Sequence, residues 1–372
     1  MSAVVISGTG LYTPPHTITN AELVASFNAY VDLFNAEHAA EIEAGTVQPL
    51  AHSSVEFIEK ASGIKSRYVM EKTGILDPKR MYPRFQERSD DQISMLAEIG
   101  VEAAKQALAA AGKTGADVDG VICACSNLQR AYPAIAIEIQ NAIGAGGYAF
   151  DMNVACSAAT FGLEQAVNAV RNGSAKCVLV INPEITSGHQ EWKDRDCHFI
   201  FGDVATATVV ERADTATSAE QWEVLGSKLA TVFSNNIRNN FGYLNRSEDS
   251  SPTARDKTFR QEGRKVFKEV VPIAAAHIEG HLSDLGHAPS AVRRYWLHQA
   301  NQGMNQLVIK KLAGDASADL APLILDEFAN TASAGSIIAF HKHRADLAAG
   351  DVGVICSFGA GYSVGSVVLR KR

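Results

Sequence analysis

The sequence predicts an α/β protein built from two similar halves, and three observations support this prediction. The chain has 372 residues, about twice the length of a typical domain. Short apolar runs alternate with stretches of helical period, which is typical of mixed sheets covered by helices. Several segments of the first half recur in the second half at a nearly constant separation. We therefore expect one half over residues 1–215 and the other over residues 222–372.

The recurring segments share one order along the chain. Each half has an apolar run that follows a helical stretch, namely "VDGVICACSN" (118–127) and "RRYWLHQANQ" (293–302). Setting Cys156 of "NVACSAATFG" on Ala332 of "FANTASAGSI" gives an offset of 176. The pair "SAKCVLVINPE" (174–184) and "AGDVGVICSFG" (349–359) gives an offset of 175. The last pair, "GDVATATVVER" (202–212) and "GYSVGSVVLRK" (361–371), gives 159, as expected if the first half has an extra loop around 185–201.

Cys156 lies at a predicted boundary between a strand and a helix. Residues 148–152 predict a strand, residues 157–171 predict a helix, and Gly173 is placed as its C-cap. At a helix N-terminus the helix dipole favours a thiolate over a thiol. A small buried cysteine at a tight crossing is the alternative interpretation of this position.

Small residues in "ACSAATFG" and "TASAGSIIA" suit two helices buried between sheets, because their backbones must approach closely. Pseudo-symmetry then makes Cys156 a neighbour of the Asn330–Thr331 segment. Residues 26–96 have no counterpart in the second half. This insertion is expected to form a cap over the site or a dimer contact.

Composition excludes several classes of function. The net charge is −7 without a strongly basic block, which argues against nucleic acid as the main partner. No apolar run reaches transmembrane length, and the first residues look like a strand and not like a signal peptide. The six cysteines lack paired zinc spacing and are too sparse for a disulfide scaffold. We expect a cytoplasmic enzyme with reduced thiols and no membrane attachment.

Three side chains converge in this arrangement: Cys156, His298 at the end of a strand, and Asn330 before the second buried helix. A thiolate can attack an acyl group and hold it as a thioester. His298 and Asn330 can both donate hydrogen bonds to one carbonyl oxygen, which suits an enolate. No carboxylate stands among them as a base, so the carbanion should come from decarboxylation. The glycine-rich turn "CSFGAGYSVGS" (356–366) can present backbone N–H groups to an oxyanion.

At these residues the sequence resembles a known family. The motifs "ACSAATFG", "LHQANQ", "NTASAGS" and "FGAGYSVGS" are similar to the signatures of β-ketoacyl-acyl-carrier-protein synthase III, in the thiolase superfamily. The resemblance spans almost the whole chain. It implies a thiolase-like fold, with the two halves in a layered α-β-α-β-α arrangement, and a homodimer in fatty-acid synthesis.

The resemblance also implies roles for individual residues. An acyl-CoA would acylate Cys156, and malonyl-acyl-carrier protein would then decarboxylate against His298 and Asn330. The amides of Cys156 and Ala360 would form the oxyanion hole. Tyr132 falls where the family places an aromatic residue at the acyl pocket and dimer boundary, although an interface or core aromatic is an equal interpretation.

Substrate binding departs from the family pattern. The positions that clamp the CoA adenine with an aromatic residue and an arginine are here Phe57 and Ala61, so the clamp is weakened or replaced. Lys268, Lys310 and Lys311 match basic positions that would dock the acidic carrier protein, although such lysines are often only a solvated helix face. The resemblance implies no cofactor and no metal. The long insertion resembles that of members that take medium-chain starters such as octanoyl-CoA.

Several alternatives stay open from the sequence. Within the same chemistry, the chain could be an acetyl-CoA-using initiator or a condensing enzyme of secondary metabolism. A degradative thiolase would need a second cysteine in the glycine-rich turn. Ser357 occupies the position where that cysteine is expected, and Cys356 is one residue away. Hydroxymethylglutaryl-CoA synthase would need a glutamate near the cysteine, and Glu164 fits poorly. An inactive scaffold, and a zinc site of His341, His343 and Asp346, are the remaining alternatives.

Overall fold

The computed structural model describes residues 3–251, 254–315 and 318–372, and these contain one large sheet of nine strands. Its strand order is β11 (Val292–Leu297), β12 (Val352–Gly359), β13 (Gly361–Lys371), β8 (Trp222–Ser234), β1 (Val4–Tyr12), β7 (Val204–Arg212), β6 (Cys177–Glu184), β4 (Gly120–Cys125), β5 (Tyr148–Asn153). The first four strands come from the second half of the chain and the other five from the first half. The two parts join where Val5 and Ile6 pair with Glu223 and Trp222. The two sheets expected from the sequence are therefore two parts of one continuous sheet.

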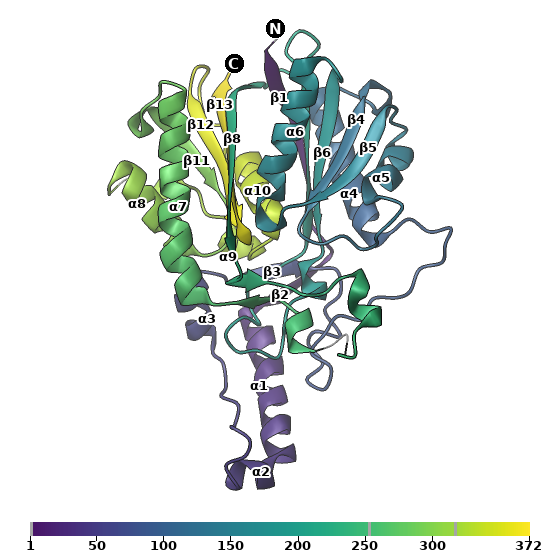
Figure 1. Ribbon diagram of the computed structural model, residues 1–372, viewed down its shortest axis with the longest axis vertical. Helices are drawn as coiled ribbons and strands as arrows, with labels where there is room; N and C mark the ends of the chain where they lie inside the picture. The colour runs from purple at the N-terminus through teal and green to yellow at the C-terminus, as the bar shows by residue number, and fades with distance from the viewer. Residues whose placement is uncertain (1–2, 252–253, 316–317) are drawn as a thin grey trace.

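Helices cover both parts of the sheet and fill the space between them (Figure 1). One outer layer holds α7 (Gly263–Asp284) and α8 (Gln302–Ala313), and the other holds α4 (Met95–Ala111) and α5 (Ile135–Ile143). The middle layer holds α6 (Ala158–Asn172) and α10 (Gly335–Lys342), whose apolar side chains share one core with strands of both parts. The layered α-β-α-β-α arrangement and the thiolase-like fold are confirmed.

The middle helices approach the sheet closely because their residues are small. A Cβ atom on Gly162 of α6 would lie 2.8 Å from the Cβ of Ala124 and 3.0 Å from a methyl group of Val180. The C-terminus of α6 is capped by Gly173 in the left-handed conformation, as predicted. The N-terminus of α6 differs from the predicted one. The helix begins at Ala158, and Cys156 lies in the 3₁₀ turn Ala155–Ser157 that precedes it.

The pseudo-symmetry of the two halves corrects the alignment drawn from the sequence. The 3₁₀ turn Ala155–Ser157 corresponds to the turn Ala332–Ala334, which sets Ala155 on Ala332. In both turns the first residue has a positive φ, 46° at Ala155 and 47° at Ala332. Cys156 therefore corresponds to Ser333, and the expected match of Cys156 with Ala332 is wrong by one position. Residue identity is too low in these segments for the sequence to fix the register.

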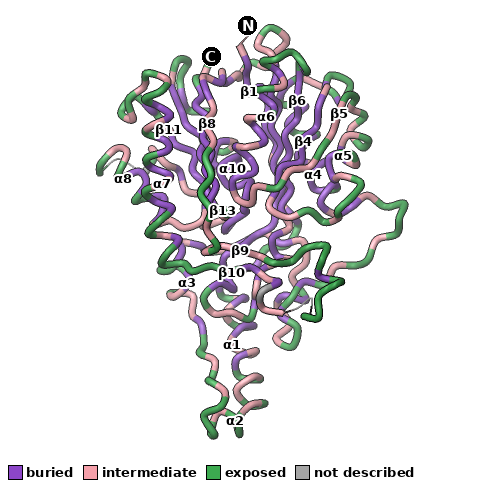
Figure 2. Tube along the Cα trace, in the orientation of Figure 1, coloured by how far each residue is buried: buried purple, intermediate pink, exposed green. Residues whose placement is uncertain are grey.

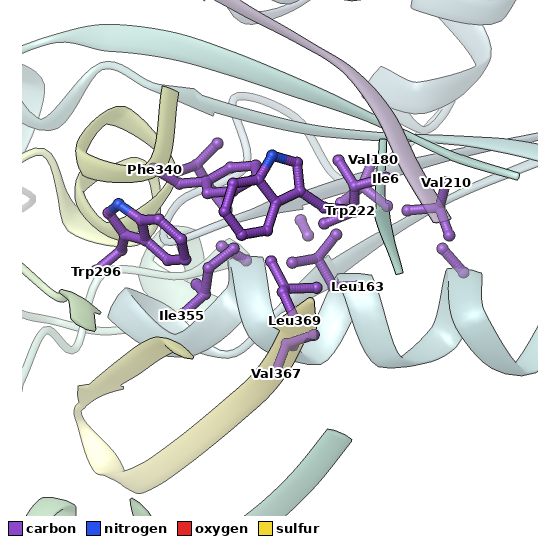
Figure 3. Close-up of a cluster of buried hydrophobic side chains, with 14 of the residues drawn as sticks. Ile6, Leu163, Val180, Val210, Trp222, Trp296, Phe340, Ile355, Val367 and Leu369 are labelled. Carbon is purple, nitrogen blue, oxygen red and sulfur yellow. The ribbon is translucent and has the colours of Figure 1, made fainter. Parts of the chain in front are cut away.

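An aromatic cluster ties the second half of the chain to the middle layer (Figure 3). Trp222 lies edge-on to Trp296 and Phe340, with ring centroids 5.4 and 5.6 Å away. All three side chains are buried, with Trp222 on β8, Trp296 on β11 and Phe340 on α10. The cluster also sits where β8 meets β1, so it supports the seam between the two parts of the sheet.

The insertion forms an arm and a cap below the sheet (Figures 1 and 2). Its helix α1 (Asn20–Glu37) begins at the capping box of Thr19 and Glu22, and α4 begins at Met95, so the expected bounds 26–96 miss the start of the arm. The short α2 (Ala39–Glu43) at the tip has no buried residue. Nearer the body, α3 (Val55–Ser62) and a ribbon of β2 (His16–Thr19) and β3 (Ser66–Val69) share an apolar core with residues 192–201.

Small elements complete the fold near the cap. A two-stranded ribbon joins β9 (Ile237–Arg238) to β10 (Arg260–Gln261), and α9 (Leu325–Phe328) precedes Asn330. Short 3₁₀ segments lie in other connections, at Gly115–Asp117, Thr186–Gly188, Tyr243–Ser247, Arg255–Lys257, Pro289–Ala291 and Ala318–Leu320.

Among the described residues, no helix has both the length and the apolar character needed to cross a membrane.

We expect Trp222→Ala to lower the free energy of unfolding by about 3–5 kcal/mol, because it removes a large buried ring and leaves a cavity at the seam of the sheet. Urea unfolding followed by circular dichroism at fixed protein concentration measures this change. Leu33→Ala, at a side chain that is 44% exposed on α1, is the matched control and should change stability little. Equal losses in the two variants would contradict the role of the cluster.

Candidate active site

The carboxyl ends of several strands open on one cavity of about 1110 Å³. Cys156 follows β5, His298 follows β11 and Asn330 follows α9, and all three side chains line this cavity. Cys156 comes from the first half of the chain and the other two from the second, and they meet because the two middle helices begin side by side. The structure thus brings together the three residues that the sequence singled out.

Cys156 faces the cavity beside the end of β12. A Cβ atom on Gly359 would lie 2.6 Å from the Cβ of Cys156, so glycine is required at that point for the cysteine to fit. Burial raises the pKa of the Cys156 thiol to about 12, and the charge of Glu184 is the next cause of the rise. The expected stabilisation of a thiolate by the helix terminus is therefore outweighed, and the resting residue is a thiol.

The two amides that the sequence predicts as an oxyanion hole lie close to the Cys156 sulfur. The backbone N–H groups of Cys156 and Ala360 both act on the Cys156 sulfur and oppose the rise of its pKa. Ala360 belongs to the tight connection between β12 and β13. Donors directed at the sulfur also lie close to the oxygen of an acyl group bound there.

His298 is a buried, neutral imidazole. Its side chain is 2% exposed and its ring lies edge-on to Phe358, with centroids 5.4 Å apart. Burial lowers the pKa of His298 to about 4, against a smaller opposing effect of the Ala332 backbone. The backbone N–H of His298 donates to the Cys356 carbonyl at 2.8 Å, which fixes the residue at the end of β11. At neutral pH the ring keeps one N–H that can donate a hydrogen bond.

The side-chain amide of Asn330 is oriented by its own turn. Its Oδ1 accepts from the Ala332 N–H at 2.9 Å, which leaves Nδ2 as the free donor. The backbone of Asn330 is held by two further bonds, from its N–H to the Ile200 carbonyl at 2.9 Å and from the Gly202 N–H to its carbonyl at 3.1 Å. A rigid donor of this kind can hold an oxygen that becomes negative during a reaction.

The cavity wall is apolar and its mouth is charged. Besides Phe57, ten large apolar side chains line it: Phe199, Ile200, Phe201, Ile237, Phe259, Val266, Phe267, Val270, Met304, Phe358. Basic residues also line it and were missed by the sequence reasoning, because no local pattern distinguishes them from other surface charges: Lys60, Arg255, Arg260, Arg264. Three carboxylates, those of Glu59, Asp194 and Asp196, also line it, and Asp194 pairs with Arg255 at 2.6 Å. The apolar wall suits a long apolar chain, and the other basic side chains suit an anionic group attached to it.

Phe57 and Ala61 are the two positions where the sequence predicts a weakened or replaced adenine clamp, and this stays a prediction. Both residues line the cavity, but Ala61 is only a small exposed residue whose carbonyl accepts from the Asn301 Nδ2 at 2.7 Å. Arg195, which is not among the residues that line the cavity, places its guanidinium carbon 3.9 Å from the centroid of the Phe57 ring. The sequence could not show this pairing, because the two residues lie in separate segments that meet only after folding.

Tyr132 does not line the cavity of its own chain. Its side chain is 85% exposed and lies in the loop before α5, so its expected place at the acyl pocket and dimer boundary stays a prediction. Lys268, Lys310 and Lys311 are exposed on α7 and α8, and none of them lines the cavity. Lys310 has an ion pair with Asp315 at 3.3 Å.

The geometry removes the two alternatives that need another catalytic residue. Cys356 is fully buried outside the cavity, and the Ser357 hydroxyl bonds that of Ser336 at 2.8 Å, so the glycine-rich turn offers the cavity no cysteine of the kind that a degradative thiolase needs. The Glu164 carboxylate accepts from the Ser227 hydroxyl and does not line the cavity, so it cannot serve a hydroxymethylglutaryl-CoA synthase.

The side chains considered for a zinc site are engaged with other partners. His341 bonds the Thr9 hydroxyl at 2.8 Å, and Asp346 pairs with Arg294. Within the described ranges, no group of three or more His, Cys, Asp or Glu residues is arranged to hold a metal ion.

Known proteins share both the sequence and the fold of this chain. Residues 150–232 match the family model of 3-oxoacyl-[acyl-carrier-protein] synthase III, and residues 282–371 match the model of its C-terminal region. The β-ketodecanoyl-[acyl-carrier-protein] synthase of Pseudomonas aeruginosa is 58% identical over 93% of this chain and 99% of its own. The β-ketoacyl-[acyl-carrier-protein] synthase III of Allorhizobium ampelinum is 30% identical over 87% of this chain and 93% of its own. Among solved structures, the 3-oxoacyl-[acyl-carrier-protein] synthase III of Aquifex aeolicus has a TM-score of 0.76 at 26% identity, covering 99% of each chain.

We expect the rate of Cys156 alkylation by iodoacetamide to keep rising from pH 7 to pH 10. The raised pKa of the thiol leaves little thiolate at neutral pH, and each unit of pH below the pKa lowers that fraction about tenfold. Peptide mass spectrometry measures the rate, with Cys156→Ala as the control for the other cysteines. A plateau below pH 8 would show that the helix terminus dominates after all.

Proposed function

Because this chain belongs to the 3-oxoacyl-[acyl-carrier-protein] synthase III family, we propose that it condenses octanoyl-CoA with malonyl-acyl-carrier protein. The product is 3-oxodecanoyl-acyl-carrier protein, released together with CoA and CO₂. The chain is then an acyltransferase of fatty-acid biosynthesis, and the cavity that holds Cys156, His298 and Asn330 together is the observation that supports it most directly.

The name of the most informative relative supports an eight-carbon starter. That protein is 58% identical to this chain and is named for a β-ketodecanoyl product of ten carbons. Malonyl groups contribute two carbons after the loss of CO₂, so the starter supplies the other eight. The ten apolar residues of the cavity wall offer the surface that such a chain would bury.

The first step transfers the acyl group to Cys156. The Cys156 sulfur attacks the thioester carbonyl, a new carbon–sulfur bond forms, and CoA leaves with the proton that the thiol loses. The amides of Cys156 and Ala360 stabilise the oxyanion of the tetrahedral intermediate. The buried thiol becomes a thiolate only as it reacts, which limits its reaction with other electrophiles at neutral pH.

The second step forms the new carbon–carbon bond. The malonyl carboxylate leaves as CO₂, and its electron pair moves into an enolate whose oxygen accepts hydrogen bonds from His298 and Asn330. A neutral imidazole and an amide both donate without taking the proton away, which fits the low pKa of His298. The carbanion then attacks the Cys156 thioester and expels the thiolate, which is reprotonated. This chemistry calls for no cofactor and no metal.

Substrate binding follows from the mouth of the cavity. Phe57 on the cavity wall offers an aromatic face for the CoA adenine, and Lys60, Arg260 and Arg264 offer partners for its phosphates. The carrier protein is acidic, and Lys268, Lys310 and Lys311 are exposed on the two helices that also contribute Phe267 and Gly303 to the cavity. We place the docking surface there.

Two further features concern assembly and compartment. β5 is an end strand of the sheet, and exposed apolar side chains gather on it and beside it: Leu128, Tyr132, Ile137, Phe150. An uncovered apolar edge is a ready pairing surface, so we place a homodimer contact at β5, with Tyr132 at its boundary. All six cysteines are free thiols, which supports a reducing, cytoplasmic location.

The starter is tested by intact-protein mass after incubation with acetyl-, octanoyl- or dodecanoyl-CoA. We expect a single octanoyl adduct on the native protein and none on Cys156→Ala. An acetyl adduct alone would make the chain an ordinary initiator of fatty-acid synthesis. The absence of any adduct would contradict the acyl-CoA donor.

The division of labour is tested by His298→Ala and Asn330→Ala. Both variants should still gain the octanoyl group on Cys156, since neither side chain takes part in that step. Both should lose decarboxylation of malonyl-acyl-carrier protein, by about 10²-fold or more, because a preorganised donor to the enolate is removed. Released CO₂ and the mass of the carrier protein measure the second reaction. Loss of acylation in both variants would refute this assignment.

The dimer contact is tested by Phe150→Lys, which places a charge on the β5 edge. We expect the variant to shift from dimer to monomer in sedimentation-velocity runs at micromolar concentration. Leu33→Lys on the arm is the matched control and should leave the dimer intact. A monomeric native protein would contradict the contact.

A further inference from the structure

Glu184 is a buried carboxylate beside the active site that the proposed reaction does not use. It is the last residue of β6, and its side chain is 1% exposed. Its oxygens accept from the Ser126 N–H at 2.9 Å and the Ser126 hydroxyl at 2.5 Å. They also accept from the Ser333 N–H at 3.1 Å and from the Ser333 hydroxyl. Four donors from two serines satisfy the carboxylate in a place without solvent.

These bonds join two segments that are far apart in sequence. Ser126 directly follows β4, whereas Ser333 stands shortly after Asn330 in the 3₁₀ turn Ala332–Ala334. The Asn330 backbone is held on its other side by Ile200 and Gly202. Glu184 therefore holds the turn that follows Asn330, whereas Ile200 and Gly202 hold the backbone of Asn330 itself.

The pseudo-symmetry of the fold shows what Glu184 replaces. Glu184 ends β6 and Gly359 ends β12, and the two strands have equal length. Gly359 touches Cys156 in the first turn, and Glu184 bonds Ser333 in the second, where Ser333 is the counterpart of Cys156. One copy of the turn leaves room for a nucleophile, and the other fills that room with a carboxylate.

The residue two positions before each turn also matches between the two halves of the chain. Asn153 is the counterpart of Asn330, and the side-chain oxygen of each accepts a 2.9 Å bond from the N–H two positions ahead. The two turns are thus built alike up to the position that Glu184 contacts. The second turn differs from the first because Ser333 donates hydrogen bonds to the Glu184 carboxylate.

We propose that Glu184 is a positioning residue, which locks the Ser333 turn and so fixes the Asn330 amide at the place where the enolate oxygen forms. The assignment of that oxygen rests on the proposed function. Glu184 acts on Asn330 through Ser333 and touches no reacting atom.

The charge of Glu184 gives the proposal a second readout. Burial raises the pKa of Glu184 to about 7, while its serine donors lower it, so the carboxylate is partly ionised at neutral pH. That charge also raises the pKa of Cys156. The same charge raises the pKa of the buried Cys123 and Cys125 thiols on β4. His298 stays neutral because burial lowers its pKa to about 4.

The test separates the two partial reactions in Glu184→Gln. Glutamine keeps the shape, and its oxygen can take the place of Oε1, which accepts both Ser333 bonds and the Ser126 N–H. An uncharged amide oxygen accepts these bonds more weakly than a carboxylate does, and the NH₂ group cannot accept from the Ser126 hydroxyl, so the Ser333 turn loosens. We expect octanoyl transfer to Cys156 to stay close to that of the native protein. Decarboxylation of malonyl-acyl-carrier protein, measured without any acyl-CoA, should fall on the order of 10-fold to 100-fold, as small misplacements of a catalytic group do. Equal losses in both reactions, or no loss in decarboxylation, would overturn the proposal.

Ser333→Ala and the double variant show whether the two residues act through one contact. If they do, the double variant loses no more decarboxylation than the worse single variant. Ser333→Ala also replaces Glu184→Gln as the test if the glutamine variant does not fold. Additive losses would contradict the shared contact.

Glu211→Gln is the matched control. Glu211 is also a fully buried carboxylate that accepts from a serine hydroxyl, here Ser7 at 2.6 Å, but it pairs with Lys113 on the far end of the sheet. Its loss should lower stability without changing the ratio of the two partial reactions. An equal change of that ratio in both glutamine variants would reduce Glu184 to a general structural role.

Alkylation keeps the proposal independent of the proposed function. Glu184→Gln removes the negative charge near the Cys156 sulfur, so the pH profile of iodoacetamide labelling should shift to lower pH, and Glu211→Gln should not shift it. If no acyl-CoA or malonyl thioester reacts with the native protein, the proposed function fails. Glu184 is then judged by this shift and by the displacement of Asn330 in a crystal structure of Glu184→Gln, and the absence of both would overturn its role.

Discussion

The close packing of α6 and α10 between the two parts of the sheet is the constraint on which the rest of the structure depends. Both helices must approach strands on two sides, and the 3₁₀ turns and first residues that begin them, 155–159 and 332–336, are all small. This packing places the starts of the two helices next to each other at the carboxyl ends of the strands. The reactive thiol and the Asn330 amide meet because of it, although they come from opposite halves of the chain.

Burial at this meeting point sets the chemistry of each group. A thiol and an imidazole in contact with water would titrate close to neutral pH, but here burial raises the pKa of Cys156 and lowers that of His298. Both groups are therefore uncharged at rest. The site depends on backbone and side-chain donors, fixed in place before the substrate arrives, and such donors act most strongly where water is excluded.

The duplicated turn shows how one local structure serves two purposes. The turn before α6 presents the Cys156 thiol, and the turn before α10 follows the Asn330 amide, with a similar positive φ at an alanine in each. What differs is the residue that ends the neighbouring strand, Gly359 in one case and Glu184 in the other. A change at one packed position thus decides whether the turn is open or filled. The insertion adds a cap to this centre and supplies part of the cavity mouth.

The sequence by itself determined the two halves, the small-residue helices and the trio of Cys156, His298 and Asn330. Apolar period, glycine positions and residue type are properties of short segments, so they can be recognised without coordinates. Only the tertiary structure decided the register of the repeat, the pairing of Phe57 with Arg195, the exposure of Tyr132 and the contacts of Glu184. These depend on which segments pack together across long separations, and on how much water each group loses when they do. Spacing along the chain encodes neither quantity, which is why a thiolate was expected where the fold holds a thiol.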